Sequence, residues 1–266
     1  MKRCSLWLAV VASLSIGACG STTEPSTTTT TTATPTLGIS PPTTALAVGQ
    51  TQAYTVINAA ATDVITWSSS DAAILQVDSA GNATGIARGS VTLTATSSAG
   101  TTATLPIQVA PNYQGNWSGN TTVTACTDIG GFATNNYCAQ RIRTTQRITM
   151  SLTQTGLGIG GTVTVTEPGG QVSGPVSGAI GAGGDITTLV GTLTGVVGGA
   201  NLSTALISWN SLASTSGMTG NFAATSTSSQ IVGIATVQWQ FGGVARTAST
   251  VQGSGLRGIL PMFARR

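Results

Sequence analysis

The sequence predicts an all-β protein in which a β-sandwich is followed by an antiparallel, eight-stranded up-and-down β-barrel. The composition is that of β-structure, because glycine, threonine, serine, valine and alanine dominate while only 6% of residues are charged and 40% are hydrophobic. From Leu37 onward, short alternating runs are broken by glycine, aspartate and serine about every ten residues, which is typical of a sandwich. After Pro111 the alternating runs are longer and glycine-rich turns join them, which predicts consecutive antiparallel strands.

Residues 1–18 have the layout of a signal peptide. Lys2 and Arg3 form a short basic start. The apolar stretch from Leu6 to Ile16 is too short to span a bilayer as a helix but has the length of a signal-peptide core. We therefore expect the chain to be exported from the cytoplasm.

The segment Ile16-Gly17-Ala18-Cys19 ends this leader. It resembles the lipobox of bacterial lipoproteins, which implies that the thiol of Cys19 is acylated and that Cys19 becomes the N-terminus. An ordinary signal peptide cut near Ala18 is the alternative. Gly20 stands where that family carries the aspartate that retains a lipoprotein at the inner membrane, so the resemblance implies the outer membrane or the cell surface.

Residues 19–36 are rich in threonine, serine and proline and lack large apolar side chains. Such a segment cannot bury enough surface to offset its ordering entropy, so we expect an extended tether between the lipid anchor and the first domain. The leader and this tether predict a partner for the chain, namely a membrane contacted through the lipid.

Residues 37–110 carry the pattern of the sandwich. Val91, Leu93 and Ala95 alternate with threonines, so one face of this strand is expected to enter the core while the other meets water. Trp67 ends a similar run before a serine-rich turn, and its large apolar surface predicts a core position.

Three motifs in this region point to a known domain. They are the Trp67-Ser68-Ser69 turn, the Val77-Asp78-x-x-Gly81 hairpin and the segment Gly85-x-x-x-Gly89-x-x-x-Leu93-x-Ala95. Together they resemble the bacterial Ig-like group 2 (BIG2) domain, which implies a seven-stranded sandwich of the kind found in bacterial surface adhesins. Such domains serve both as adhesive tips and as spacers, and a single copy beside the tether favours the spacer.

Residues 111–266 are expected to form the barrel. A meander of about eight strands with short connections closes most readily into a barrel, because closure removes exposed sheet edges. Inward candidates that could fill a narrow interior are Leu189, Leu193, Trp209, Phe222 and Trp239. The expected strands cover 116–126, 140–155, 159–167, 172–181, 185–196, 201–210, 217–225 and 230–241, with 244–252 as a continuation.

The tripeptide Gly115-Asn116-Trp117 opens the first of these strands. It resembles the Gly-x-Trp of calycins, the lipocalin and avidin type of ligand-holding barrel, in which the tryptophan closes one end. In lipocalins an arginine near the last strand packs over that tryptophan, and the resemblance implies this role for Arg246.

The run around residues 141–154 alternates regularly. Arg141, Arg143 and Arg147 share one face of the expected strand, whose other face is apolar. Three arginines on one outward row could hold phosphate or an acidic glycan. The alternative, which we favour, is a solubilising row that discourages strand-to-strand aggregation.

Cys126 and Cys138 remain after the leader and the anchor are set aside. In an exported protein such a pair is most simply a disulfide, and the intervening loop offers too few ligands for a metal site. We expect no cofactor and no bound metal.

The missing residue types exclude several chemistries. The chain has no histidine, and its only lysine is Lys2 in the leader, so Ser-His-Asp and Ser-Lys catalysis and His-ligated metals are excluded. Only carboxylates remain as acids and bases. In the second domain these are Asp128, Glu167 and Asp185, and turn chemistry explains each without catalysis. We predict that the protein is not an enzyme.

The charge balance after removal of the leader, eight basic residues against seven acidic ones, offers no cation cluster for nucleic acid. The preferred hypothesis is a surface-anchored binding or adhesion module with its specificity in the barrel. Its candidate partners are a glycan, a small hydrophobic ligand and a surface protein. The competing hypothesis is a structural spacer of the envelope whose barrel has a solid core and no small ligand.

Overall fold

The computed structural model describes residues 36–247. The signal peptide, Cys19, most of the tether and residues 248–252 of the suggested last strand lie outside the described residues. Within them, no helix is long and apolar enough to cross a membrane.

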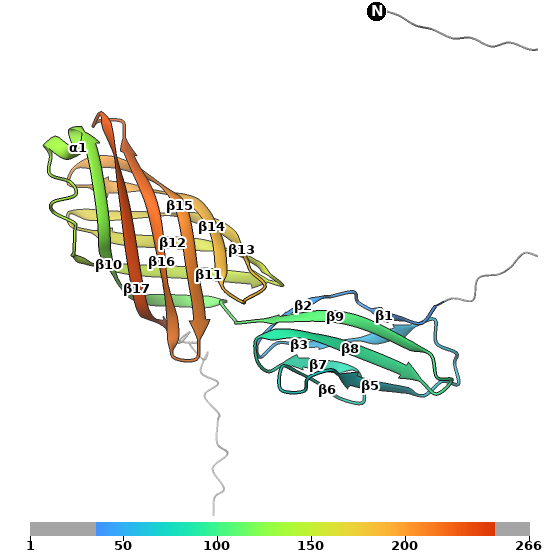
Figure 1. The fold of residues 1–266 in the computed structure, drawn as a ribbon. Coiled ribbons are helices and arrows are strands. Elements are labelled where there is room, and N and C mark those ends of the chain that lie inside the picture. Colours follow the sequence, from blue (N-terminus) through green and yellow to red (C-terminus); the bar gives the residue numbers. More distant parts are fainter. Residues whose placement is uncertain (1–35, 248–266) are drawn as a thin grey trace, which may run out of the picture. The chain divides into compact units, whose positions relative to one another are not determined.

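The first part of the described chain is a sandwich of short strands (Figure 1). One sheet has four strands in the order β2 (Ala45–Ala47), β9 (Thr102–Ala110), β8 (Gly89–Ser97) and β5 (Ile65–Ser69). The other has three, in the order β3 (Thr51–Ala53), β7 (Asn82–Gly85) and β6 (Leu75–Val77). A separate two-stranded ribbon joins β1 (Gly38–Ser40) to β4 (Thr55–Ile57).

The core of this sandwich follows from the alternation along β8. Val91, Leu93 and Ala95 are buried, whereas the threonines between them are half-buried. Trp67 is half-buried and packs against the same core. Gly81 makes its packing possible, because a Cβ there would lie 2.5 Å from the Tyr54 carbonyl oxygen and 2.9 Å from the Trp67 ring, at a φ of +85°.

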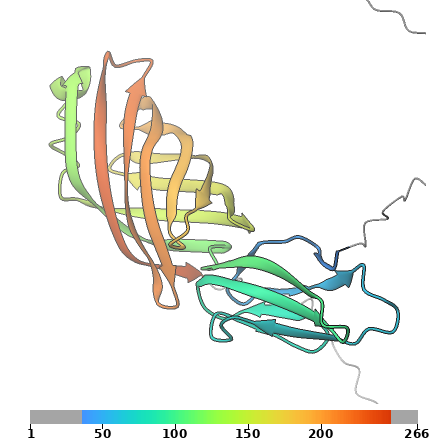
Figure 2. The same cartoon turned by 45° about the vertical axis from the view of Figure 1, so that its right-hand side comes forward.

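The second part is a closed barrel of eight antiparallel strands in sequential order (Figures 1 and 2). Each strand pairs with the next, and the last pairs with the first to close the barrel. The predicted all-β fold with an eight-stranded up-and-down barrel is therefore confirmed. The strands are β10 (Gly115–Gly130), β11 (Thr145–Thr155), β12 (Gly158–Glu167), β13 (Gly170–Ile180), β14 (Ile186–Val197), β15 (Ala200–Ser214), β16 (Gly217–Ser228) and β17 (Gly233–Thr247).

Strand register gives the barrel a polar outer wall. One row of hydroxyl side chains passes through direct register partners on seven successive strands, because serine or threonine occupies the same row on each. The row consists of Ser118, Thr149, Thr164, Ser173, Thr194, Ser203 and Thr227.

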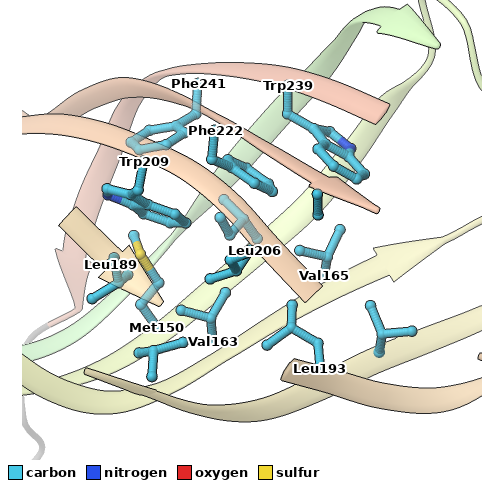
Figure 3. Close-up of a cluster of buried hydrophobic side chains, with 14 of the residues drawn as sticks. Met150, Val163, Val165, Leu189, Leu193, Leu206, Trp209, Phe222, Trp239 and Phe241 are labelled. Carbon is cyan, nitrogen blue, oxygen red and sulfur yellow. The ribbon is translucent and has the colours of Figure 1, made fainter. Parts of the chain in front are cut away.

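Side chains fill the barrel interior (Figure 3). Trp209 stacks on Phe222 at a centroid distance of 4.9 Å, and Phe222 stacks on Trp239 at 4.6 Å. Phe241 packs against the same stack. Aliphatic side chains such as Leu193 occupy the space opposite these rings. All five inward candidates named from the sequence are buried, which confirms their assignment to the core.

Candidate functional site

A loop covers one end of the barrel. This cap, residues 131–144, connects β10 to β11 and contains the short helix α1 (Gly131–Thr134). Phe132 and Tyr137 point from the cap into the barrel core, and their rings meet edge to face at 5.1 Å. The chain enters the cap through Gly130, where φ is +65° and an added Cβ would lie only 2.5 Å from the Val232 carbonyl oxygen, so only glycine fits.

A disulfide fixes the cap to the barrel wall. Cys126 of β10 bonds to Cys138 of the cap, with a Cα–Cα distance of 5.4 Å, which is the pairing that the sequence predicts. The backbone N–H of Cys138 also donates a hydrogen bond of 2.8 Å to the Asp128 carboxylate. Asp128 therefore helps to position the cap.

Removing the disulfide by the Cys126→Ser, Cys138→Ser double substitution is expected to lower the free energy of unfolding by about 3 kcal/mol, because the bond closes a short loop in the unfolded chain. Urea unfolding of the oxidised protein and of the variant measures the difference. A change within experimental error would show that the cap holds its place without the bond.

The cap delivers an arginine to a buried carboxylate. Arg141 Nε donates to Glu167 Oε2 at 2.7 Å, and both side chains are buried. The same guanidinium lies 3.5 Å above the Tyr137 ring and donates through Nη1 to the Tyr137 carbonyl oxygen at 3.0 Å. The Tyr137 hydroxyl donates to Glu167 Oε2 at 3.1 Å. The arrangement ties the cap to the end of β12.

Burial raises the pKa of Tyr137 well above its ordinary value, and the neighbouring Glu167 carboxylate raises it further. The hydroxyl therefore stays protonated and remains a hydrogen-bond donor to Glu167. Ser226 lies beside this hydroxyl and shares a hydrogen bond of 2.9 Å with Thr204. Polar groups thus continue from the cap into the barrel.

The predicted arginine row is wrong. The second strand begins at Thr145 rather than near residue 140, so Arg141 and Arg143 lie in turns of the cap. Arg141 is 3% exposed, whereas Arg143 is exposed at a φ of +63°. Only Arg147 stands on the outer wall of β11, where it donates to Ser118. Alternation failed as a guide here because the ion pair, not a strand face, determines where Arg141 points.

The interpretation of Glu167 as a turn residue is also wrong. Glu167 is the last residue of β12 and is 4% exposed, with its side chain inside the barrel. A signal for this was present, because Val163, Val165 and Glu167 share the same face of an alternating strand. Tyr137 and Gln146, which also belong to this end, were not singled out from the sequence.

The other end of the barrel is closed by Trp117 and Tyr113. Trp117 is 3% exposed and its indole N–H donates to the Tyr113 carbonyl oxygen at 2.8 Å. The Arg246 guanidinium carbon lies 4.7 Å from the Trp117 ring centroid, as the resemblance to lipocalins implied, and its Nη2 donates to the Asn112 carbonyl oxygen. The geometry matches the expected roles, while kinship with calycins stays a prediction.

The capped end also presents apolar side chains outward. Ile129 of β10 and Ile234 of β17 are direct register partners and are 61% and 41% exposed. Val232 lies in the turn just before β17, two residues before Ile234, and is 90% exposed. We call these three side chains the tip patch. They lie at the end of the barrel opposite Gly115, where the chain enters it.

Residues 33–107 match the model of the bacterial Ig-like domain (group 2). The match covers most of the sandwich and confirms the resemblance seen in the sequence. A search of curated proteins finds none that matches this chain. The chain thus combines a bacterial Ig-like domain with a closed antiparallel barrel. Together with the disulfide, this domain indicates an extracytoplasmic bacterial protein.

Proposed function

We propose that the chain is a lipid-anchored protein of the bacterial surface that acts as a non-catalytic adhesion module and binds its partner through the tip patch. The exposure of Ile129, Val232 and Ile234 is the observation that carries this proposal. Contiguous exposed aliphatic side chains on a soluble domain are typical of an interaction surface.

The N-terminal sequence supports surface display. The basic and apolar leader, the lipobox-like segment ending at Cys19 and the threonine-rich tether are the parts that such an anchor requires. The Ig-like domain then serves as the spacer that follows the tether. An outer-membrane or cell-surface location follows from Gly20 after the acylated cysteine.

Packing favours binding at the surface over binding in the lumen. The aromatic stack of Trp209, Phe222 and Trp239 occupies the space that a small hydrophobic ligand would need. Among the described residues, the large hydrophobic side chains with high exposure are isoleucines and valines rather than the aromatic residues that stack on sugars. The partner that fits best is therefore another protein.

The buried carboxylate supports a function without catalysis. Glu167, one of three carboxylates in the barrel, is held by Arg141 and Tyr137 beneath the cap. A general acid or base needs access to its substrate, and this side chain is covered.

A structural spacer is the second candidate. The filled interior and the hydroxyl row on the outer wall favour it, because both suit an inert domain that holds other parts at a distance. The two candidates differ in whether removal of the tip patch changes adhesion.

We expect cells that display the full chain to lose retention on plates coated with extracellular-matrix protein, by several-fold, when the tip patch is changed by Ile129→Ser, Val232→Ser and Ile234→Ser. Counting of retained cells under flow measures this, with dextran-coated plates as the comparison for glycan binding. Cys19→Ser should abolish retention altogether, because the thiol that receives the lipid is lost and the chain is not displayed at the surface.

The matched control changes three comparably exposed aliphatic residues away from the capped end, Ile57→Ser, Val190→Ser and Ile207→Ser. It should leave retention unchanged. Equal loss in both triple variants would contradict a role of the tip patch. Retention of wild-type cells no greater than that of cells lacking the protein would favour the spacer.

A further inference from the structure

Two polar atoms inside the capped end make no hydrogen bond within the described chain. They are the amide nitrogen Nε2 of Gln146 and the carboxylate oxygen Oε1 of Glu167. Both residues are more than nine-tenths buried. Buried polar groups are nearly always hydrogen-bonded, so this pair calls for a partner.

The register brings the two side chains together. Arg147 of β11 pairs with Thr166 of β12, so the next residues, Gln146 and Glu167, lie opposite each other with both side chains directed into the barrel. Opposite residues of antiparallel strands have their Cβ atoms about 5 Å apart. One small ligand can therefore contact both side chains.

The orientation of the Gln146 amide is determined by its neighbour. The Trp239 indole N–H, which can only donate, bonds to Gln146 Oε1 at 2.9 Å. The amide NH₂ group must then point away from the indole. Gln146 thus offers donor hydrogens inside the barrel that none of residues 36–247 accepts.

The other atom offers the complementary chemistry. Glu167 Oε2 accepts from Arg141 and from Tyr137, which leaves Oε1 as a free acceptor. The charge of the carboxylate is already balanced by the Arg141 guanidinium. A ligand here need not carry charge, but it must accept from Gln146 and donate to Glu167.

We propose that Gln146 and Glu167 form an internal binding site for one small neutral hydroxyl group, which bridges Gln146 Nε2 and Glu167 Oε1 beneath the cap. Water is the hydroxyl that fits a site covered in this way, since buried waters typically bridge otherwise unsatisfied polar groups. The hydroxyl of a small solute, such as glycerol, supplies the same chemistry. The bridging group completes the hydrogen bonding that joins the cap to β11 and β12.

A high-resolution crystal structure of the full-length protein with its disulfide intact tests the site. We expect ordered density within hydrogen-bond distance of both Gln146 Nε2 and Glu167 Oε1. Density the size of one oxygen identifies water, and larger density present only in crystals soaked with glycerol identifies a site that also takes a solute hydroxyl. A direct bond between the two side chains, with no density beside them, would overturn the proposal.

A variant keeps the test independent of crystals. Gln146→Met removes the donor at nearly constant volume, and Gln171→Met makes the same change at an exposed position of neighbouring β13. Nuclear Overhauser transfer from bound water to backbone amides of residues 145–147 and 166–167 should be present in the wild type and in Gln171→Met. It should be lost in Gln146→Met.

If Gln146→Met fails to fold, the measurement on the wild type is sufficient. A bound water of long residence gives Overhauser transfer to these amides without any substitution. Absence of transfer in the wild type would rule the site out, and so would transfer that persists unchanged in a folded Gln146→Met variant.

Discussion

Arg141→Met is expected to lower the free energy of unfolding by about 3–5 kcal/mol. Methionine keeps much of the apolar contact with the Tyr137 ring but removes the guanidinium from a carboxylate that is buried away from bulk solvent. An uncompensated buried charge is what makes the loss of one partner so costly. Urea unfolding followed by tryptophan fluorescence measures the change, because Trp239 lies at the same end of the barrel.

The double variant Arg141→Met, Glu167→Leu should recover most of the loss, because a buried ion pair replaced as a whole by apolar side chains is often neutral in stability. Arg143→Met is the matched control. It alters an exposed arginine two residues away in the same cap, and we expect a change of no more than about 0.5 kcal/mol. Equal effects of Arg141→Met and Arg143→Met would contradict the ion pair as the link between cap and barrel.

The protein is expected to lose stability steeply above about pH 10. All three tyrosines of the chain are buried, and burial raises the pKa of Tyr54 to about 12 and raises those of Tyr113 and Tyr137 as well. In the unfolded chain a tyrosine has a pKa of about 10. At a pH between the unfolded and the folded pKa of a tyrosine, the unfolded chain therefore releases a proton that the folded protein keeps.

The stability that the protonated, buried tyrosines contribute is complete below about pH 10 and is lost as the pH rises toward their folded pKa values. Each tyrosine contributes about 1.4 kcal/mol per pH unit, so three contribute up to about 4 kcal/mol per unit. Few other groups titrate in this pH range, since residues 36–247 contain no lysine and Cys126 and Cys138 are bonded to each other.

Urea unfolding midpoints measured between pH 8 and 11 at constant ionic strength give the slope of stability against pH. Tyr137→Phe should remove about one third of it, because the substituted ring no longer titrates. A flat profile across this range would show that the hydroxyls ionise in the folded protein as easily as in the unfolded chain.

The strands of the barrel could be predicted from the sequence because their side chains obey a single rule. Inward positions such as Leu189, Leu193 and Trp239 are apolar, many outward positions are threonine or serine, and glycines mark the turns. The sandwich could be recognised for another reason, since its turns need particular residues such as Gly81.

The capped end could not be predicted in the same way. Arg141 and Tyr137 lie in an irregular loop, where no repeat shows which side chain points inward. Gln146 and Glu167 do follow strand alternation, and the expected strand 159–167 even ended at Glu167, but alternation alone does not show that a loop residue will supply a buried partner for an inward polar side chain. A start of β11 placed five residues too early put Arg141 on the outer wall.

The closure of the barrel between β10 and β17 has a consequence for how the chain folds. Every other pairing in the barrel joins consecutive strands, whereas closure brings Gly130 to Gly233 and Asn116 to Thr247. Local hairpins form quickly, and contacts between distant segments form slowly because the entropy of a long loop must be overcome first. Synthesis delivers the N-terminal strands first, so β10 keeps an unpaired edge until β17 becomes available. Folding of this barrel can therefore finish only after β17 has been made.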